Sequence, residues 1–221
     1  MTNSTHSAEH LPDSPGALAI TKAAAKLFAQ HGYDQVSMNA IAAAAGVSKA
    51  NIFHHFESKE GLYQAVLVSA CGKTKQLLSE LFADEGNYSR QFSQFAAAHL
   101  EHLFQETEAA RLILRELLEG SGHLTEKLPQ QIMQENFQHL VATITQGQTA
   151  NVLRKNVDPA ILATILVGAN VFFFLAHELL GQFDQGRFVE NPGEYSRALA
   201  DILLQGCLNP SNTSLRQESI G

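Results

Sequence analysis

Tryptophan is absent from the 221 residues, and cysteine occurs only twice, as Cys71 and Cys207. Two cysteines without a C-x-x-C pair exclude a disulfide-rich domain and the common zinc-binding spacings. Both lie among apolar residues of helical segments, so we expect small buried side chains at these positions. The N-terminus also lacks the basic-then-apolar pattern of a signal peptide. These absences favour a cytoplasmic protein.

Long uninterrupted apolar runs are missing as well. The longest apolar stretch, Ile161–Ala176, contains Thr164, Gly168 and Asn170. It is shorter than the ~20 residues that a membrane-spanning helix requires, so we expect a buried helix and no membrane association. We find no useful length of period-two alternation and no internal repeat. The sequence therefore predicts an all-α fold.

Basic residues are scarce overall, because the formal net charge is −7. Their distribution is uneven. Residues 1–75 contain 6 lysines and 5 acidic residues, whereas residues 76–221 contain 9 basic and 17 acidic residues. A nucleic-acid-binding surface is therefore expected only in the N-terminal part.

Helix start and stop signals divide the chain. Ser14-Pro15 begins a first helix that ends at Gly32, and Ser37, Ser48 and Ser58 begin three more. Longer helices follow at roughly 88–105, 109–120, 125–149, 158–182 and 192–208. Residues 1–13 are expected to form a disordered tail, and residues 211–221 a frayed one.

The segment from Ser37 to Phe56 has the pattern of a helix-turn-helix motif. Small residues at Ala42–Ala45 allow two helices to approach closely, and Gly46 permits a sharp turn with a left-handed backbone. Ser48 then caps the second helix, whose first turn can face a major groove. Four helices within about 65 residues form a three-helix DNA-binding unit with a connector.

This stretch and its flanks resemble the TetR family of bacterial transcriptional regulators over about Leu18 to Leu67. The resemblance rests on three segments: Ala24-x-x-Leu27-Phe28-x-x-x-Gly32, Ile41-Ala42-x-x-Ala45-Gly46-Val47-Ser48-Lys49, and Phe53-x-His55-Phe56-x-Ser58-Lys59-Glu60-x-Leu62. It implies a DNA-binding domain at residues 14–74, with its motif at 37–56. A ligand-binding and dimerisation domain would occupy 75–210. It further implies a homodimer on a near-palindromic double-stranded operator, released by a small-molecule effector.

The same resemblance implies the DNA contacts. Ser37 and Lys59 fall where family members contact phosphate, and Asn39, Lys49, Ala50 and Asn51 fall at or near base-reading positions. Phe53 stands where the family usually has tyrosine, so a phosphate-donating hydroxyl is missing, and His54 is the alternative donor. The expected DNA-binding residues are Ser37, Met38, Asn39, Lys49, Ala50, Asn51, Phe53, His54, His55 and Lys59. Lys49 as a solvated surface lysine and Asn51 as a local cap are the alternatives.

The C-terminal part is less informative. His99 and His102 share a helical face with Phe95, and three interpretations remain open: buried polar residues, pocket lining, or metal ligands. We expect an apolar effector pocket with sparse polar anchors, lined by Phe95, His99, Phe137 and His177. In the most apolar helix, the resemblance implies a dimer interface that includes Gly168, Phe172 and Ala176.

The favoured function is a ligand-responsive repressor. A DNA-binding protein whose C-terminal domain engages a protein partner is the second hypothesis, favoured by a flat exposed apolar patch. An enzyme is the third and is disfavoured, because the sequence has no nucleophile motif, glycine-rich phosphate loop or metal-ligand spacing. We expect no cofactor and no metal.

Overall fold

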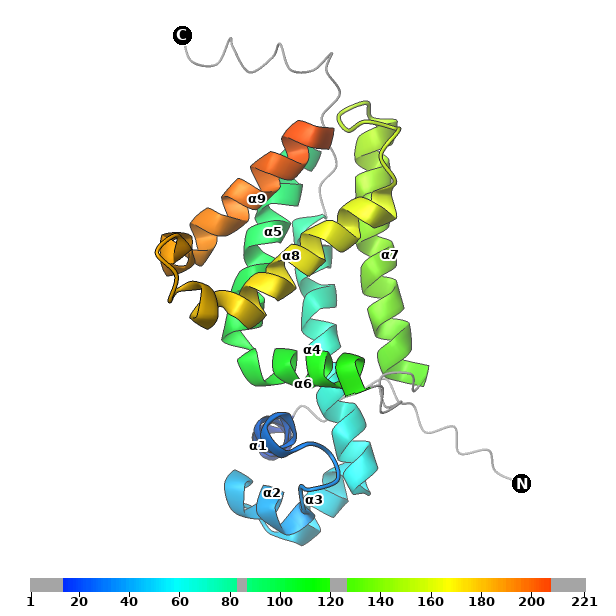
Figure 1. Ribbon diagram of the computed structural model, residues 1–221. Helices are drawn as coiled ribbons and strands as arrows, with labels where there is room; N and C mark the ends of the chain where they lie inside the picture. Colours follow the sequence, from blue (N-terminus) through cyan, green and yellow to red (C-terminus); the bar gives the residue numbers. More distant parts are fainter. Residues whose placement is uncertain (1–13, 83–86, 120–126, 208–221) are drawn as a thin grey trace, which may run out of the picture. The chain divides into compact units, whose positions relative to one another are not determined.

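The computed structural model describes residues 14–82, 87–119 and 127–207. The tails expected at 1–13 and 211–221, and the side chain of Cys207, lie outside the described residues. The described part contains α-helices and one short 3₁₀ helix, and no β-strand (Figure 1). The all-α fold class is therefore confirmed.

The helices begin and end close to the signals in the sequence. The N-terminal group comprises α1 (Pro15–His31), α2 (Met38–Ala45), α3 (Lys49–Phe56) and α4 (Lys59–Leu81). The later group comprises α5 (Tyr88–Gln105), α6 (Thr107–Glu119), α7 (Lys127–Thr149), α8 (Pro159–Leu180) and α9 (Pro192–Cys207). The 3₁₀ helix η2 (Gly186–Glu190), between α8 and α9, was not expected.

Local hydrogen bonds explain these boundaries. The side chains of Ser14, Ser37 and Ser48 each accept a hydrogen bond from the backbone N–H three residues later, at 3.2, 3.1 and 3.2 Å. Such caps satisfy N–H groups that have no partner inside the helix. Gly46 ends α2 with φ 68° and ψ 30°, the left-handed conformation that favours glycine.

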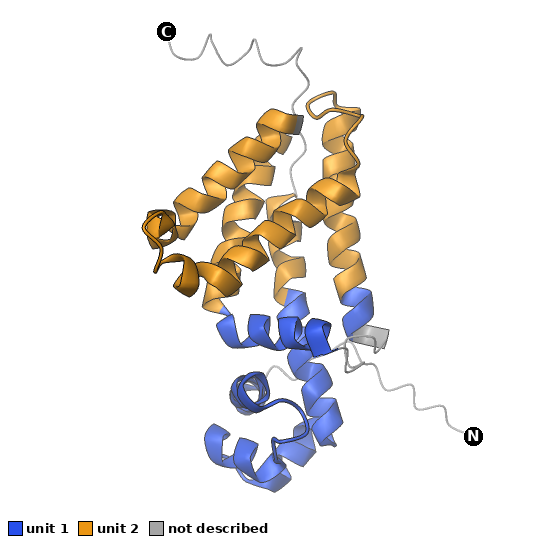
Figure 2. Cartoon of the chain, viewed as in Figure 1, with its two compact units in different colours: residues 1–72, 106–132 blue, residues 73–105, 133–221 orange. Residues whose placement is uncertain are grey.

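The chain folds into two compact units, coloured in Figure 2. Unit 1 comprises residues 1–72 and 106–132, and unit 2 comprises residues 73–105 and 133–221. α4 and α7 therefore each contribute residues to both units. The sequence pattern did not predict that α6 belongs to unit 1, where it packs on α1.

The core of unit 1 is built from α1, α2, α3, α4 and α6. Ile20, Phe28, Ile41, Ile52 and Leu62 are fully buried. Phe28, Tyr33 and Tyr63 form an aromatic cluster, with centroid distances of 4.8 to 5.9 Å. This core holds the exposed sides of α2 and α3 in place.

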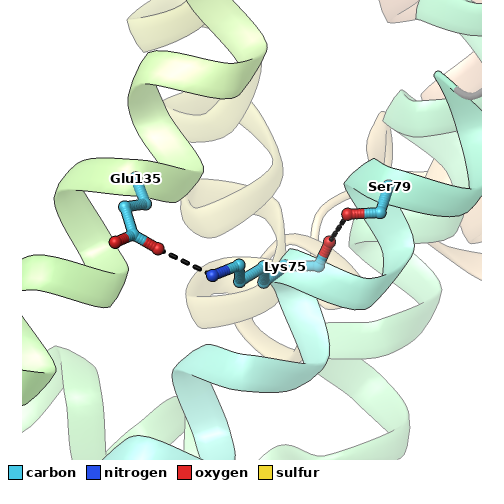
Figure 3. A network of polar contacts seen from close by, with 3 residues as sticks. All are labelled: Lys75, Ser79 and Glu135. Carbon is cyan, nitrogen blue, oxygen red and sulfur yellow. Dashed lines mark hydrogen bonds and ion pairs between the residues drawn. The ribbon is translucent and has the colours of Figure 1, made fainter.

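The core of unit 2 lies where α5 packs against both α8 and α9 (Figure 1). The buried cluster is Leu78, Phe92, Phe95, Ala96, Leu140, Ile144, Leu153, Leu162, Ala163, Leu166, Ala200 and Leu204. At the surface of this unit, Lys75 Nζ on α4 lies 2.7 Å from Glu135 Oε2 on α7 (Figure 3). Both side chains are more than one-third exposed, so this ion pair adds little stability.

α8 differs from the buried helix expected for Ile161–Ala176. It spans 22 residues and is long and apolar enough to cross a membrane, yet only 33% of its most apolar window is buried. One such helix is weak support for a membrane span, because core helices of soluble proteins pass the same test. The exposed apolar residues lie along one side of the helix, which suits packing against another protein surface.

Candidate functional site

α3 buries one side and exposes the other. Ile52 is fully buried and Phe56 is 6% exposed, so these two residues anchor the helix to unit 1. The exposed side chains lie one helical turn apart and share a face: Lys49, Ala50, Phe53 and His54. A helix with one face sealed and the other exposed has the form required to enter a major groove.

Lys49 and Phe53 interact on this face. The Nζ atom of Lys49 lies 5.7 Å from the centroid of the Phe53 ring, which is 40% exposed. This is within the range of a cation–π contact, which restricts where the ammonium group can point. Phe53 lacks the hydroxyl of a tyrosine, but its ring can position Lys49. Lys49 and Phe53 are four positions apart, a spacing that predicts a contact on a helix, but the sequence analysis did not use it.

Two serines at helix starts also lie on the exposed surface. Ser37 precedes α2, and its Oγ accepts from Ala40 N at 3.1 Å. Its hydroxyl proton remains available to an anion. Ser48 plays the same capping part for α3, accepting from Asn51 N at 3.2 Å. Each serine hydroxyl therefore lies at the positive end of a helix dipole, a combination that suits phosphate.

Lys59, the first residue of α4, is held by the loop after α1. Its Nζ lies 4.3 Å from the centroid of the Tyr33 ring and donates to the Asp34 carbonyl at 3.4 Å. Burial, together with a hydrogen bond to Glu60, raises the pKa of Tyr33 to about 12. Tyr33 is a neutral phenol at pH 7, and its ring packs against the ammonium group of Lys59.

The remaining expected DNA-binding residues differ in exposure. Asn39 is exposed, while Asn51 and His55 are half-buried. The His55 ring lies beside His54 and Phe56, with centroids 5.3 and 6.0 Å away.

Met38 departs from the expectation. Its side chain is 8% exposed and packs in the core, because it shares the inward face of α2 with Ile41 and Ala42. Met38 therefore helps to hold α2 in place, and its contact with DNA stays a prediction.

A buried hydrogen bond joins α6 to α4 inside unit 1. The Tyr63 hydroxyl donates to Glu116 Oε1, and the two residues are 1% and 5% exposed. Burial, and then the Glu116 carboxylate, raise the pKa of Tyr63. The preceding residue on α6, Arg115, packs its guanidinium group on Gly32 at the end of α1. The sequence analysis missed the hydrogen bond between Tyr63 and Glu116, because the two residues are 53 positions apart.

Unit 2 brings together two of the four expected effector residues. The rings of Phe95 and His99 stack on α5, with centroids 5.5 Å apart. Burial, with a smaller contribution from His102, lowers the pKa of His99 to about 4. His99 is therefore neutral at pH 7. Its Nδ1 lies 3.2 Å from the amide nitrogen of Asn170 on α8, a residue that sequence reasoning missed.

The other two expected residues lie elsewhere. His177 belongs to a separate aromatic cluster, with its ring centroid 4.8 Å from Phe104 and 6.5 Å from Phe173. Phe137 is 42% exposed on α7, so it lies at the surface rather than in the core. Within the described residues, no group of three or more His, Cys, Asp or Glu side chains could hold a metal ion.

The expected interface helix carries an exposed apolar stripe. Its members recur every three or four residues: Ile161, Ile165, Gly168, Phe172, Leu175 and Leu179. Phe172 is 63% exposed, and a Cβ added to Gly168 would meet nothing within 4 Å. Ala176 is half-buried beside the stripe. A stripe of this period is a helix-packing surface.

Comparison with known proteins identifies the N-terminal module. Residues 20–66 match the family model described as bacterial regulatory proteins, tetR family. The matched segment contains α2, α3 and the first turns of α4, together with the exposed face described above. The N-terminal domain therefore belongs to the TetR family.

Individual relatives and structures agree with this assignment. The chain is 34% identical over 116 residues to the HTH-type transcriptional regulator RutR of Escherichia coli K12, a match that covers 50% of this chain and 51% of RutR. The chain thus spans about half the length of that relative. It is 25% identical over 173 residues to the A-factor receptor protein of Streptomyces griseus, covering 76% of this chain and 56% of that protein.

A solved structure extends the likeness to most of the chain. The fatty acid degradation regulator FadR of Bacillus halodurans superimposes with a TM-score of 0.69 at 18% identity, covering 87% of this chain and 96% of that one. At this identity the likeness concerns the fold alone.

Proposed function

We propose that this protein is a cytoplasmic, homodimeric transcriptional repressor. It binds a near-palindromic operator through α2 and α3 and leaves it when a small, mostly apolar effector binds in unit 2. The observation that carries the proposal is the exposed face of α3, backed by a sealed core, in a domain of the TetR family. The relatives named a regulator and a receptor support the same function.

Dimerisation through the apolar stripe on α8 belongs to this proposal. A face with this much exposed apolar surface requires a partner, and a two-fold axis lets the same stripe serve both subunits. Two recognition helices then read two half-sites about 34 Å apart. A different protein bound to the stripe is the second candidate, and the oligomeric state of the purified chain separates the two.

Effector control requires a connection between the units, and α4 provides one covalently. Its residues Lys59–Gly72 belong to unit 1, and residues Lys73–Leu81 belong to unit 2. An effector that favours one arrangement of this helix weakens DNA binding by its differential affinity for the two states. A coupling of about 1–3 kcal/mol is typical of such systems.

Lys49→Ala tests the recognition face. We expect it to weaken binding to the selected operator by about 1–3 kcal/mol, because the ammonium group lies on the first turn of α3 and can reach base edges. The operator is first selected from random duplexes with the wild-type protein, and affinities are measured by fluorescence anisotropy. If the folded Lys49→Ala protein binds the operator as tightly as wild type does, the assignment of α3 to the DNA interface is wrong.

Lys59→Ala tests the phosphate contact. We expect similar losses on the operator and on unrelated DNA, and a salt dependence whose slope falls by about one, because a phosphate contact carries no sequence information. Titrations at several salt concentrations on both duplexes measure this. A loss restricted to the operator would contradict the assignment of Lys59 to phosphate.

A further inference from the structure

Unit 2 contains a buried polar pair that joins α5 to α8. Asn170 on α8 is fully buried, and His99 on α5 is 6% exposed. The amide nitrogen of Asn170 donates to the Ala96 carbonyl at 2.8 Å and lies 3.2 Å from His99 Nδ1. Buried polar groups in an apolar core are costly unless each one is hydrogen-bonded. Each donor and acceptor of Asn170 and His99 therefore needs a hydrogen-bond partner.

The hydrogen bonds of Asn170 fix the orientation of its amide group and the protonation of the His99 ring. The Ala96 carbonyl can only accept, so the amide nitrogen of Asn170 must face it. The second hydrogen of that nitrogen points to His99 Nδ1, which must accept and is therefore unprotonated. The proton of the neutral imidazole then lies on Nε2. Both hydrogens of the Asn170 amide are used.

The amide oxygen of Asn170 remains. No donor among the described residues reaches Oδ1, although the atom is completely buried. Rotating the amide does not help, because it would turn the oxygen toward the Ala96 carbonyl. The fold therefore holds an acceptor in a fixed direction and offers it no donor.

Apolar and aromatic side chains lie close to the pair. Phe95 stacks on His99, and the Phe82 ring lies 5.9 Å from Phe95. Along α8, Leu166 lies one turn before Asn170 and is fully buried. A single oriented acceptor among such side chains has the composition of a small-molecule site, where a few polar groups fix the orientation of an apolar ligand.

We propose that Asn170 Oδ1 anchors the effector by accepting a hydrogen bond from an uncharged hydroxyl group on an otherwise apolar molecule. The proposal deepens the function above and rests on it, since it names the chemical class of the effector. A carboxylate is excluded at this point, because two acceptors cannot form a hydrogen bond and a buried charge would lack a partner. An ether of the same shape has no hydrogen to donate.

The test compares probes that differ only in the head group. Octanol, decanol and dodecanol are titrated against the full-length protein without DNA, each beside its methyl ether and the matching carboxylate. Calorimetry and the thermal unfolding midpoint report binding. We expect at least one alcohol to bind about tenfold more tightly than its ether and its carboxylate, the discrimination of one neutral hydrogen bond. No alcohol binding, or equal binding of alcohol and ether, overturns the proposal.

Two variants locate the effect. Asn170→Leu, which removes the acceptor and preserves the size, is expected to abolish the alcohol preference and leave ether binding within about twofold. Ser196→Ala removes the hydroxyl of another fully buried side chain with no described partner and is expected to keep the preference. Persistence of the preference in Asn170→Leu contradicts the anchor. If that variant does not fold, the wild-type comparison still decides.

DNA release is measured separately on the selected operator. Alcohols that bind through Asn170 without releasing DNA support the anchor and contradict effector control. Probes that release DNA without any head-group preference support effector control and contradict the anchor. The two proposals can therefore fail independently.

Discussion

Phe172→Glu will convert a dimer into monomers and will lower operator affinity at least about 100-fold. Phe172 lies near the middle of the apolar stripe on α8 and is 63% exposed in the single chain. On a two-fold axis the substitution removes two aromatic rings and places two like charges in one buried interface. A monomer that reaches only one half-site retains about half of the contacts with DNA.

Sedimentation equilibrium at micromolar concentration measures the mass, and anisotropy with the selected operator measures the affinity. Leu118→Glu is the matched control, because it places the same charge on another exposed apolar residue, 84% exposed on α6. This control is expected to remain dimeric. If wild-type protein sediments near 24 kDa, the stripe belongs to a different partner and the homodimer is wrong.

Glu116→Ala will lower the free energy of unfolding by about 2–3 kcal/mol. The carboxylate is 5% exposed and accepts a hydrogen bond from the buried Tyr63 hydroxyl. Hydrogen bonds to charged groups in a dry core are among the stronger ones, and the truncation also leaves unfilled space between α4 and α6. Urea unfolding followed by circular dichroism measures the loss.

The control is Glu119→Ala on the same helix. Glu119 pairs with Arg115 at the surface, where its side chain is 51% exposed, so we expect a change of no more than about 1 kcal/mol. Tyr63→Phe completes a double-mutant cycle with Glu116→Ala. Equal stability losses at Glu116 and Glu119, or a coupling near zero, would show that the buried bond does not stabilise unit 1.

The features that could be predicted from the sequence depend on neighbours in the chain. A serine cap bonds three residues onward, and a helix-ending glycine such as Gly46 is marked by its own conformational freedom. Every long helix was therefore anticipated to within a few residues. The exposed positions Lys49 and Phe53 follow equally from the helical repeat, once Ile52 and Phe56 are assigned to the core.

The features that were missed depend on contacts between distant segments. Asn170 and His99 are 71 positions apart, and no local pattern relates the two residues. Phe137 was expected in a pocket because a phenylalanine-rich set is interrupted by a few histidines, and the structure gives its side chain an exposed fraction of 42% on α7. Met38 lies on the inward face of α2 and is 8% exposed, which a family motif position alone does not reveal.

The stripe on α8 also has a consequence for the lifetime of newly made chains. If the chain dimerises through this stripe as proposed, six neighbouring positions of apolar or backbone surface stay open to proteases and to aggregation until a second subunit binds. The thermal midpoint of such a dimer would rise with protein concentration, because association is governed by mass action. A cell that makes few copies of this chain would therefore hold part of it as short-lived single subunits. Synthesis rate and degradation, in addition to the effector, would then set how much of the operator is occupied.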